Sequence, residues 1–164
     1  MDKIDPSTSS LIDIGCGSGY LLGKIGEKFP AVQLNGFDIK EPNGDEKFNY
    51  VHGNIEQLPF EDNAYDLILC NHVLEHIPDD TKAMQELYRV LKPGGMGIFQ
   101  IPQDLKRATT FTDDSITDPK ERAKVFGQYD HVRVYGRDYF DTLRSIGFTV
   151  IEEDYTQKIG AEKV

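Results

Sequence analysis

The segment Asp13–Tyr20, DIGCGSGY, carries the most chemical information in this chain. Gly15 and Gly17 let a backbone turn tightly and approach a ligand without a Cβ in the way, and Gly19 lets the following helix pack close. About twenty residues further on, Asp38 in GFDIK closes the second predicted strand, where dinucleotide-binding folds place the acid that accepts hydrogen bonds from a ribose diol. The loop and Asp38 together predict a nucleoside site; a solvated acid at a strand end is the simpler alternative.

Asp13 and the glycine spacing discriminate between two candidate cofactors that both contain adenosine, NAD and S-adenosylmethionine (SAM). NAD folds continue with the spacing G-x-G-x-x-G, whereas the spacing here is G-x-G-x-G. A carboxylate two residues before Gly15 would repel a pyrophosphate and attract the ammonium and sulfonium groups of SAM. The charge at the loop therefore favours SAM.

Four residues are hypotheses for catalysis and substrate binding. His72 and His131 are the candidate bases, because an imidazole titrates near neutral pH; a histidine that hydrogen-bonds the backbone is an equally good interpretation. Arg133 is a candidate for binding a substrate carboxylate or phosphate, and Tyr135 for shaping the pocket; a surface ion pair and a core aromatic are the alternatives. We expect no metal site, since the histidines do not fall at ligand spacing with the two cysteines, which we interpret as reduced core thiols.

Apolar runs and helical patterns alternate along the chain and must position these residues. The sequence is typical of an α/β protein with a Rossmann-like, mostly parallel sheet and helices on both faces. A polar, lid-like insertion is expected over 103–135 within a single domain, 1–164, with one short helix between Asp118 and Gly127. Strands are predicted at 11–15, 32–39, 48–53, 65–71, 96–102 and 148–155, and further helices at 21–29, 83–91 and 139–146.

Composition limits the partners. The 164 residues carry a formal net charge of -10, which argues against nucleic acid and anionic membranes and favours a small-molecule substrate. The first residues contain no apolar segment of the signal-peptide kind, so we expect a cytoplasmic protein.

Four motifs, in order over residues 11 to 102, resemble the class I SAM-dependent methyltransferases, in particular the small metabolite methyltransferases of type 11. They are LIDIGCGSGY, GFDIK, GNIEQLPFEDNAYDLILCNHVLEHIPD and RVLKPGGMGIFQIP. The resemblance implies SAM as cofactor, with S-adenosylhomocysteine (SAH) as product. It places Asp13, Gly15 and Gly17 at the methionine end, Asp38 on the ribose, Ile39, Asn54 and Ile55 around the adenine, and Asn71 with His72 where methyl and acceptor meet.

The sequence departs from the family pattern in three places. Asn54 stands where an aspartate is more usual. About ten residues precede Leu11, where the family usually has a helix, and the tail after Tyr155 is short and polar for a seventh strand. An uncovered sheet edge would favour a homodimer.

The predicted function is transfer of a methyl group from SAM to an unidentified small-molecule acceptor. A general base is needed for an alcohol or phenol and not for a thiol or a neutral amine. The alternative is a non-catalytic SAM- or SAH-binding module or an incomplete methyltransferase fragment. An NAD-dependent oxidoreductase is disfavoured by the glycine spacing and by Asp13.

Overall fold

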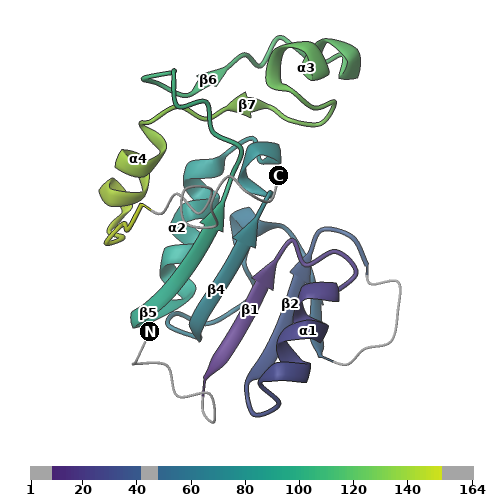
Figure 1. The fold of residues 1–164 in the computed structure, drawn as a ribbon, viewed down its shortest axis with the longest axis vertical. Helices are drawn as coiled ribbons and strands as arrows, with labels where there is room; N and C mark the ends of the chain where they lie inside the picture. The colour runs from purple at the N-terminus through teal and green to yellow at the C-terminus, as the bar shows by residue number, and fades with distance from the viewer. Residues whose placement is uncertain (1–8, 42–47, 153–164) are drawn as a thin grey trace, which may run out of the picture.

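The computed structural model describes residues 9–41 and 48–152 and contains one five-stranded parallel sheet (Figure 1). The strand order is β3-β2-β1-β4-β5, and every neighbouring pair is parallel. This order confirms the predicted Rossmann-like α/β class. The strands are β1 (Ser10–Ile14), β2 (Gln33–Asp38), β3 (Asn49–His52), β4 (Tyr65–Asn71) and β5 (Leu91–Gln100).

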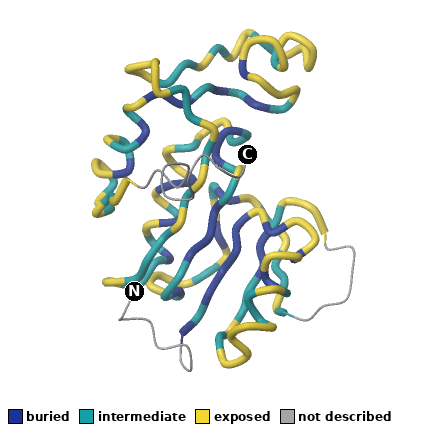
Figure 2. The backbone as a smooth tube through the Cα atoms, in the orientation of Figure 1, coloured by how far each residue is buried: buried dark blue, intermediate teal, exposed yellow. Residues whose placement is uncertain are grey.

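Successive side chains along each strand point to opposite faces of the sheet, and the apolar ones form a layer on each face. On one face, Leu11 and Leu69 pack with Leu22 of α1 (Tyr20–Lys28). On the other face, Ile12 and Ile68 belong to the larger cluster, which includes residues of α2 (Asp80–Val90) and α4 (Tyr139–Ile146). The central strands are accordingly the most deeply buried part of the chain (Figure 2).

The helix boundaries follow their capping residues. Asp79 caps the start of α2 by accepting a hydrogen bond from Lys82 N at 3.0 Å. Asp118 caps α3 (Pro119–Phe126), which ends at Gly127 as predicted. No helix in the described part of the chain is long and apolar enough to cross a membrane.

Two sequence predictions are corrected by the structure. Leu91, expected on the helix, begins β5 instead, because α2 ends at Val90 before the Pro-Gly-Gly sequence is reached. No strand forms over 148–152; residues 153–155 of that predicted strand, the polar tail and residues 1–8 lie outside the described residues. The alternating apolar pattern there has another cause, because Phe148 packs edge-on against the rings of Tyr88 and Phe99, at centroid distances of 5.0 and 5.3 Å.

The polar insertion contains more regular structure than expected. Besides α3, it forms a two-stranded antiparallel ribbon of β6 (Phe111–Thr112) and β7 (Arg133–Val134). The ribbon and α3 lie beyond the carboxyl ends of β4 and β5, on the side where the strand arrows point (Figure 1). Ligands bind at this end of open α/β sheets, so the insertion lies over the expected site.

Candidate functional site

The glycine loop leaves β1 at the carboxyl edge of the sheet. Gly15 and Gly17 have φ angles of 73° and 54°, in the left-handed region that favours glycine. A Cβ on Gly15 would lie 2.3 Å from Val73 Cγ2, whereas a Cβ on Gly17 would meet nothing within 4 Å. Gly15 is therefore required by packing, and Gly17 faces space in which a ligand has room.

Asp38, the last residue of β2, is hydrogen-bonded to this loop. Its Oδ2 accepts from Gly17 N at 2.9 Å, and its Oδ1 accepts from Lys40 N at 3.0 Å. A carboxylate offers about four acceptor positions, so about two remain for other donors. The acid and the loop, 21 residues apart in sequence, thus form one contiguous polar surface.

Asp13 lies beneath the loop and is only 4% exposed. Burial, and to a smaller extent repulsion by the Asp38 carboxylate, raises the pKa of Asp13 to about 6. Two acids in this arrangement disfavour a bound anion and favour a bound cation. The electrostatics of the loop therefore agree with the charge argument drawn from sequence.

The residues predicted to surround an adenine differ in what they present. Ile39 follows β2 with 66% of its surface exposed, which suits a flat apolar ligand. Ile55 is buried in the core, so only its backbone is available. Asn54 caps the 3₁₀ helix η1 (Ile55–Gln57): its Oδ1 accepts from Glu56 N at 3.0 Å, and its Nδ2 donates to Glu56 Oε2 at 3.2 Å.

Asn71 and His72 lie at the carboxyl end of β4, beside the glycine loop on β1. His72 has a φ of 55°, an uncommon conformation for a non-glycine residue and one often found in functional sites. Its Nδ1 lies 3.3 Å from Glu75 Oε1, and its side chain is 57% exposed. His72 is thus an accessible imidazole whose ring is oriented by a buried carboxylate.

Arg133 and Tyr135 point inward, to a partner that the sequence did not single out. Arg133 Nη1 lies 2.6 Å from Asp80 Oδ2, and Arg133 Nη2 donates to the carbonyl oxygens of Ile77 and Pro78. The Tyr135 hydroxyl donates to the same Asp80 oxygen at 2.6 Å. Both side chains are buried. They attach β7 and the residue after it to the start of α2.

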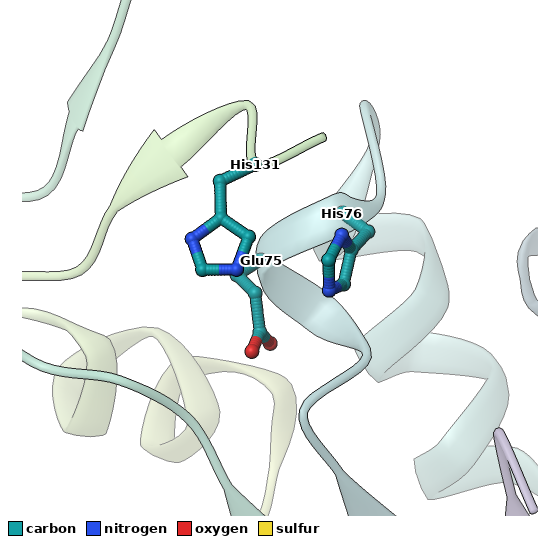
Figure 3. Close-up of side chains that lie close together, drawn as sticks. All are labelled: Glu75, His76 and His131. Carbon is teal, nitrogen blue, oxygen red and sulfur yellow. The ribbon is translucent and has the colours of Figure 1, made fainter. Parts of the chain in front are cut away.

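His131 joins a second buried group in the same region, with Glu75 and His76 of the 3₁₀ helix η2 (Leu74–His76) (Figure 3). One potential ligand atom from each of the three lies within 4.8 Å of the others. His131 comes from a segment far along the chain, so spacing could not predict the cluster. The available signal was Glu75 itself, an acid between the apolar residues Leu74 and Ile77.

Both cysteines are buried free thiols, as expected. Burial, with repulsion by Asp13 and Asp38, raises the pKa of Cys16 to about 11. Burial also raises the pKa of Cys70. Thiols with raised pKa are poor nucleophiles at neutral pH, so neither cysteine has the character of a catalytic group.

Comparison with known proteins places these features in a family. A model of the "Methyltransferase domain" family matches residues 12–99, which include the glycine loop, Asp38 and β4. The chain is 28% identical over 163 residues to sterol 24-C-methyltransferase of Schizosaccharomyces pombe, covering 89% of this chain and 41% of that protein. It is 27% identical over 162 residues to malonyl-[acyl-carrier protein] O-methyltransferase of Methylococcus capsulatus, covering 92% and 56%.

A solved structure shares the fold. Phosphoethanolamine N-methyltransferase 2 of Haemonchus contortus, in complex with SAM, superposes with a TM-score of 0.69 at 21% identity, covering 96% of this chain and 37% of that one. The chain spans about half the length, or less, of the curated relatives named above.

Proposed function

The chain belongs to the class I SAM-dependent methyltransferases, and from this premise we propose that it binds SAM and transfers the methyl group to a small-molecule acceptor. The observation that carries the proposal is the surface formed by the glycine loop, Asp13 and Asp38 at the carboxyl ends of β1 and β2. The names of the two relatives specify methylation of a sterol carbon and of a malonyl oxygen. Sequence similarity therefore does not identify the acceptor of this chain.

The residues present fit SAM at each of its ends. Gly17 leaves open space at the loop, and the spare acceptor positions of Asp38 suit two ribose hydroxyls. Asp13 would attract the ammonium group of the methionine end, and the exposed side chain of Ile39 would cover one face of the adenine. Asn54, the Ile55 backbone and Asn71 complete the proposed cofactor site.

When bound, SAM supplies an electrophilic methyl group on a sulfonium, so the protein's work is alignment and exclusion of water. His72 is the base we propose for an alcohol or phenol acceptor, because its ring is accessible and its Nδ1 faces Glu75. The Glu75 carboxylate, 3.3 Å from Nδ1, would orient the ring electrostatically and leave Nε2 to accept a proton. His131 is buried, so any catalytic role would be exerted through the Glu75 group.

A second candidate function, a SAM- or SAH-binding module without turnover, is favoured by Arg133 and Tyr135. Both were predicted to contact substrate, yet both are hydrogen-bonded to Asp80 within the protein. In the catalytic proposal they position η2 and α2 under the acceptor site. The two functions differ in whether SAM is converted to SAH in the presence of acceptors.

Calorimetric titration of the purified chain with SAM, SAH and NAD tests the cofactor. We expect binding of SAM and SAH with micromolar Kd, which is about −8 kcal/mol, and none of NAD. Asp38→Ala should abolish SAM binding, because it removes the ribose acceptor. Asp141→Ala is the matched control, with the same charge change on a side chain that is 78% exposed on α4.

Three results would count against the proposal: NAD binding in place of SAM, no binding of SAM or SAH by a folded chain, or equal losses in both variants. If SAM binds, conversion to SAH is measured with alcohol, phenol, amine and thiol acceptors. His72→Ala should then slow transfer to alcohols and phenols and leave transfer to thiols unchanged.

A further inference from the structure

Glu75 is a deeply buried acid on η2. The residue is 1% exposed, and within the described part of the chain neither carboxylate oxygen has a hydrogen-bond partner. Beside it lies His72, whose Nδ1 is 3.3 Å from Oε1. A buried carboxylate without hydrogen bonds is costly, and native proteins rarely retain one without a ligand, ion or water.

In each of the two histidines beside Glu75, one ring nitrogen lies within hydrogen-bond distance of a backbone carbonyl oxygen. His76 Nδ1 lies 3.3 Å from the carbonyl oxygen of Asp130, and His131 Nδ1 lies 3.3 Å from the carbonyl oxygen of Phe126. A carbonyl can only accept, so in the neutral ring Nδ1 carries the hydrogen and Nε2 keeps its lone pair. Metal-binding histidines have this arrangement, in which a backbone or carboxylate oxygen fixes the tautomer.

The rings of His76 and His131 also pack against each other. Their centroids are 4.7 Å apart at an interplanar angle of 80°, and Glu75 projects beside them (Figure 3). The Asp130 carboxylate approaches His76 Nδ1 at 3.5 Å. Such an outer carboxylate raises the basicity of a ligating imidazole.

The scaffold that holds the cluster is well fixed. Val132 N donates to the carbonyl oxygen of Glu75 at 3.0 Å, which joins the His131 segment directly to η2. One residue later, Arg133 forms its buried ion pair with Asp80. Three ligands drawn from two segments are therefore held by contacts on both sides of the cluster.

From these observations we propose that Glu75, His76 and His131 bind a divalent transition-metal ion. Two imidazoles and a carboxylate suit Zn²⁺, Fe²⁺ and Co²⁺, whereas Mg²⁺ and Ca²⁺ prefer oxygen ligands alone. The potential ligand atoms lie within 4.8 Å of one another. Ligands about 2.1 Å from a tetrahedral ion are roughly 3.4 Å apart, so binding needs side-chain shifts on the order of 1 Å.

Three protein ligands leave a coordination position open, as in catalytic metal sites. What this open position would do rests on the proposed function. An ion beside His72, at the carboxyl end of β4, would bind the oxygen of an acceptor hydroxyl and lower the pKa of that hydroxyl. The ion would then favour oxygen acceptors over amines. Metal binding itself does not depend on SAM.

The test uses the full chain, freed of any affinity tag, stripped with a chelator and titrated with Zn²⁺ in the absence of SAM. We expect one ion per chain with Kd at or below micromolar, and no comparable binding of Mg²⁺. Co²⁺ is the second probe, because its visible absorption reports four- or five-coordinate nitrogen and oxygen ligation.

Glu75→Gln and His131→Asn should each weaken Zn²⁺ binding at least tenfold and remove the Co²⁺ absorption. His52→Ala is the control, because its Nε2 lies 2.8 Å from the Ile39 carbonyl oxygen, outside the cluster. Circular dichroism establishes that each variant is folded, and the Co²⁺ spectrum of the unaltered chain decides the matter if one is not.

The proposal is overturned if the unaltered chain binds no Zn²⁺, if His52→Ala loses binding as Glu75→Gln does, or if a high-resolution structure grown with Zn²⁺ shows only water beside Glu75. Any of these results leaves SAM binding by the loop untouched. Conversely, a chain that binds Zn²⁺ but not SAM would refute the proposed function and retain the metal site.

Discussion

The two halves of the site are built in different ways. The loop half is made by Asp13, Gly17 and Asp38, which lie at the ends of two adjacent parallel strands and close together in sequence. The other half is made where the segment 131–135 docks on η2 and the start of α2, more than fifty residues earlier. The first half is a property of the sheet, and the second is a product of tertiary docking.

This difference has an energetic side. In the loop half, the Asp38 carboxylate and the backbone at Gly17 are accessible to a ligand, so substitutions at these two positions should affect binding first. The polar groups of the docked half are mostly buried and paired with one another, so substitutions there should affect folding first. The predictions below test that division, beginning with the largest expected effect.

Asp80→Ala should destabilise the protein by about 3–5 kcal/mol, because it leaves the buried Arg133 cation uncompensated and removes the acceptor of the Tyr135 hydroxyl. Urea unfolding measures the change. Asp141→Ala breaks an ion pair with Arg144 on the surface and should cost about 1 kcal/mol or less. Similar losses in the two variants would contradict the idea that the docked half is fixed by Asp80.

Much of the loop half was predictable because its signals are local. The spacing DIGCGSGY, and an acid about one strand later, follow from the geometry of a strand, a turn and a helix, whatever the rest of the chain does. Strand β4 was likewise predicted over the residues that form it, since a run buried on both faces has few other interpretations.

The docked half was not predictable for a physical reason. Arg133, Tyr135 and His131 were singled out as unusual polar residues, but their partners Asp80 and Glu75 are determined by how a long insertion folds back. Phe148 shows the same limit, because its apolar pattern matched a strand while its ring packs on Tyr88 and Phe99. Periodicity reports that a residue is buried, and not what it is buried against.

Gly17→Ala tests whether the open space at the loop is a ligand site. Its φ of 54° makes any side chain cost about 1–2 kcal/mol of stability, although a Cβ meets no protein atom. Gly94→Ala is matched to it, with a φ of 78° and no atom within 4 Å of a Cβ. Both should lower the free energy of unfolding equally, and only Gly17→Ala should weaken SAM binding, by tenfold or more in calorimetry.

Asp13 should couple SAM binding to pH. Its pKa of about 6 in the ligand-free protein means that ionisation, needed to attract an ammonium group, is lost as the pH falls through 6. SAM affinity should therefore fall towards tenfold per pH unit below that point. Asp13→Asn should bind weakly at every pH, and a variant that keeps the wild-type pH profile would assign the titration to another group.

The same raised pKa predicts that the ionised form of Asp13, which favours SAM binding, lowers the stability of the fold. A carboxyl whose pKa is raised in the folded state stabilises the fold below its unfolded pKa of 3.8, and this contribution is lost as the pH rises through 6. Asp13→Asn should therefore unfold at higher urea than the wild type at pH 8, and the gap should narrow at pH 5. A destabilised Asp13→Asn at pH 8 would show that the acid supports the fold.

The smallest expected effect concerns Asn54, the residue that caps η1. Asn54→Asp keeps the oxygen that caps η1 but replaces the amide that donates to Glu56 Oε2, so two carboxylates then face each other. Stability should fall by only about 0.5 kcal/mol, because the pair is exposed. SAM affinity should rise two- to threefold, about 0.5 kcal/mol, since a carboxylate is the stronger acceptor for an adenine amine. Asn49→Asp, at the opposite end of β3 and bonded to Asn35, should leave affinity unchanged; an equal gain there would mean that charge alone, and not contact with the adenine, strengthens binding.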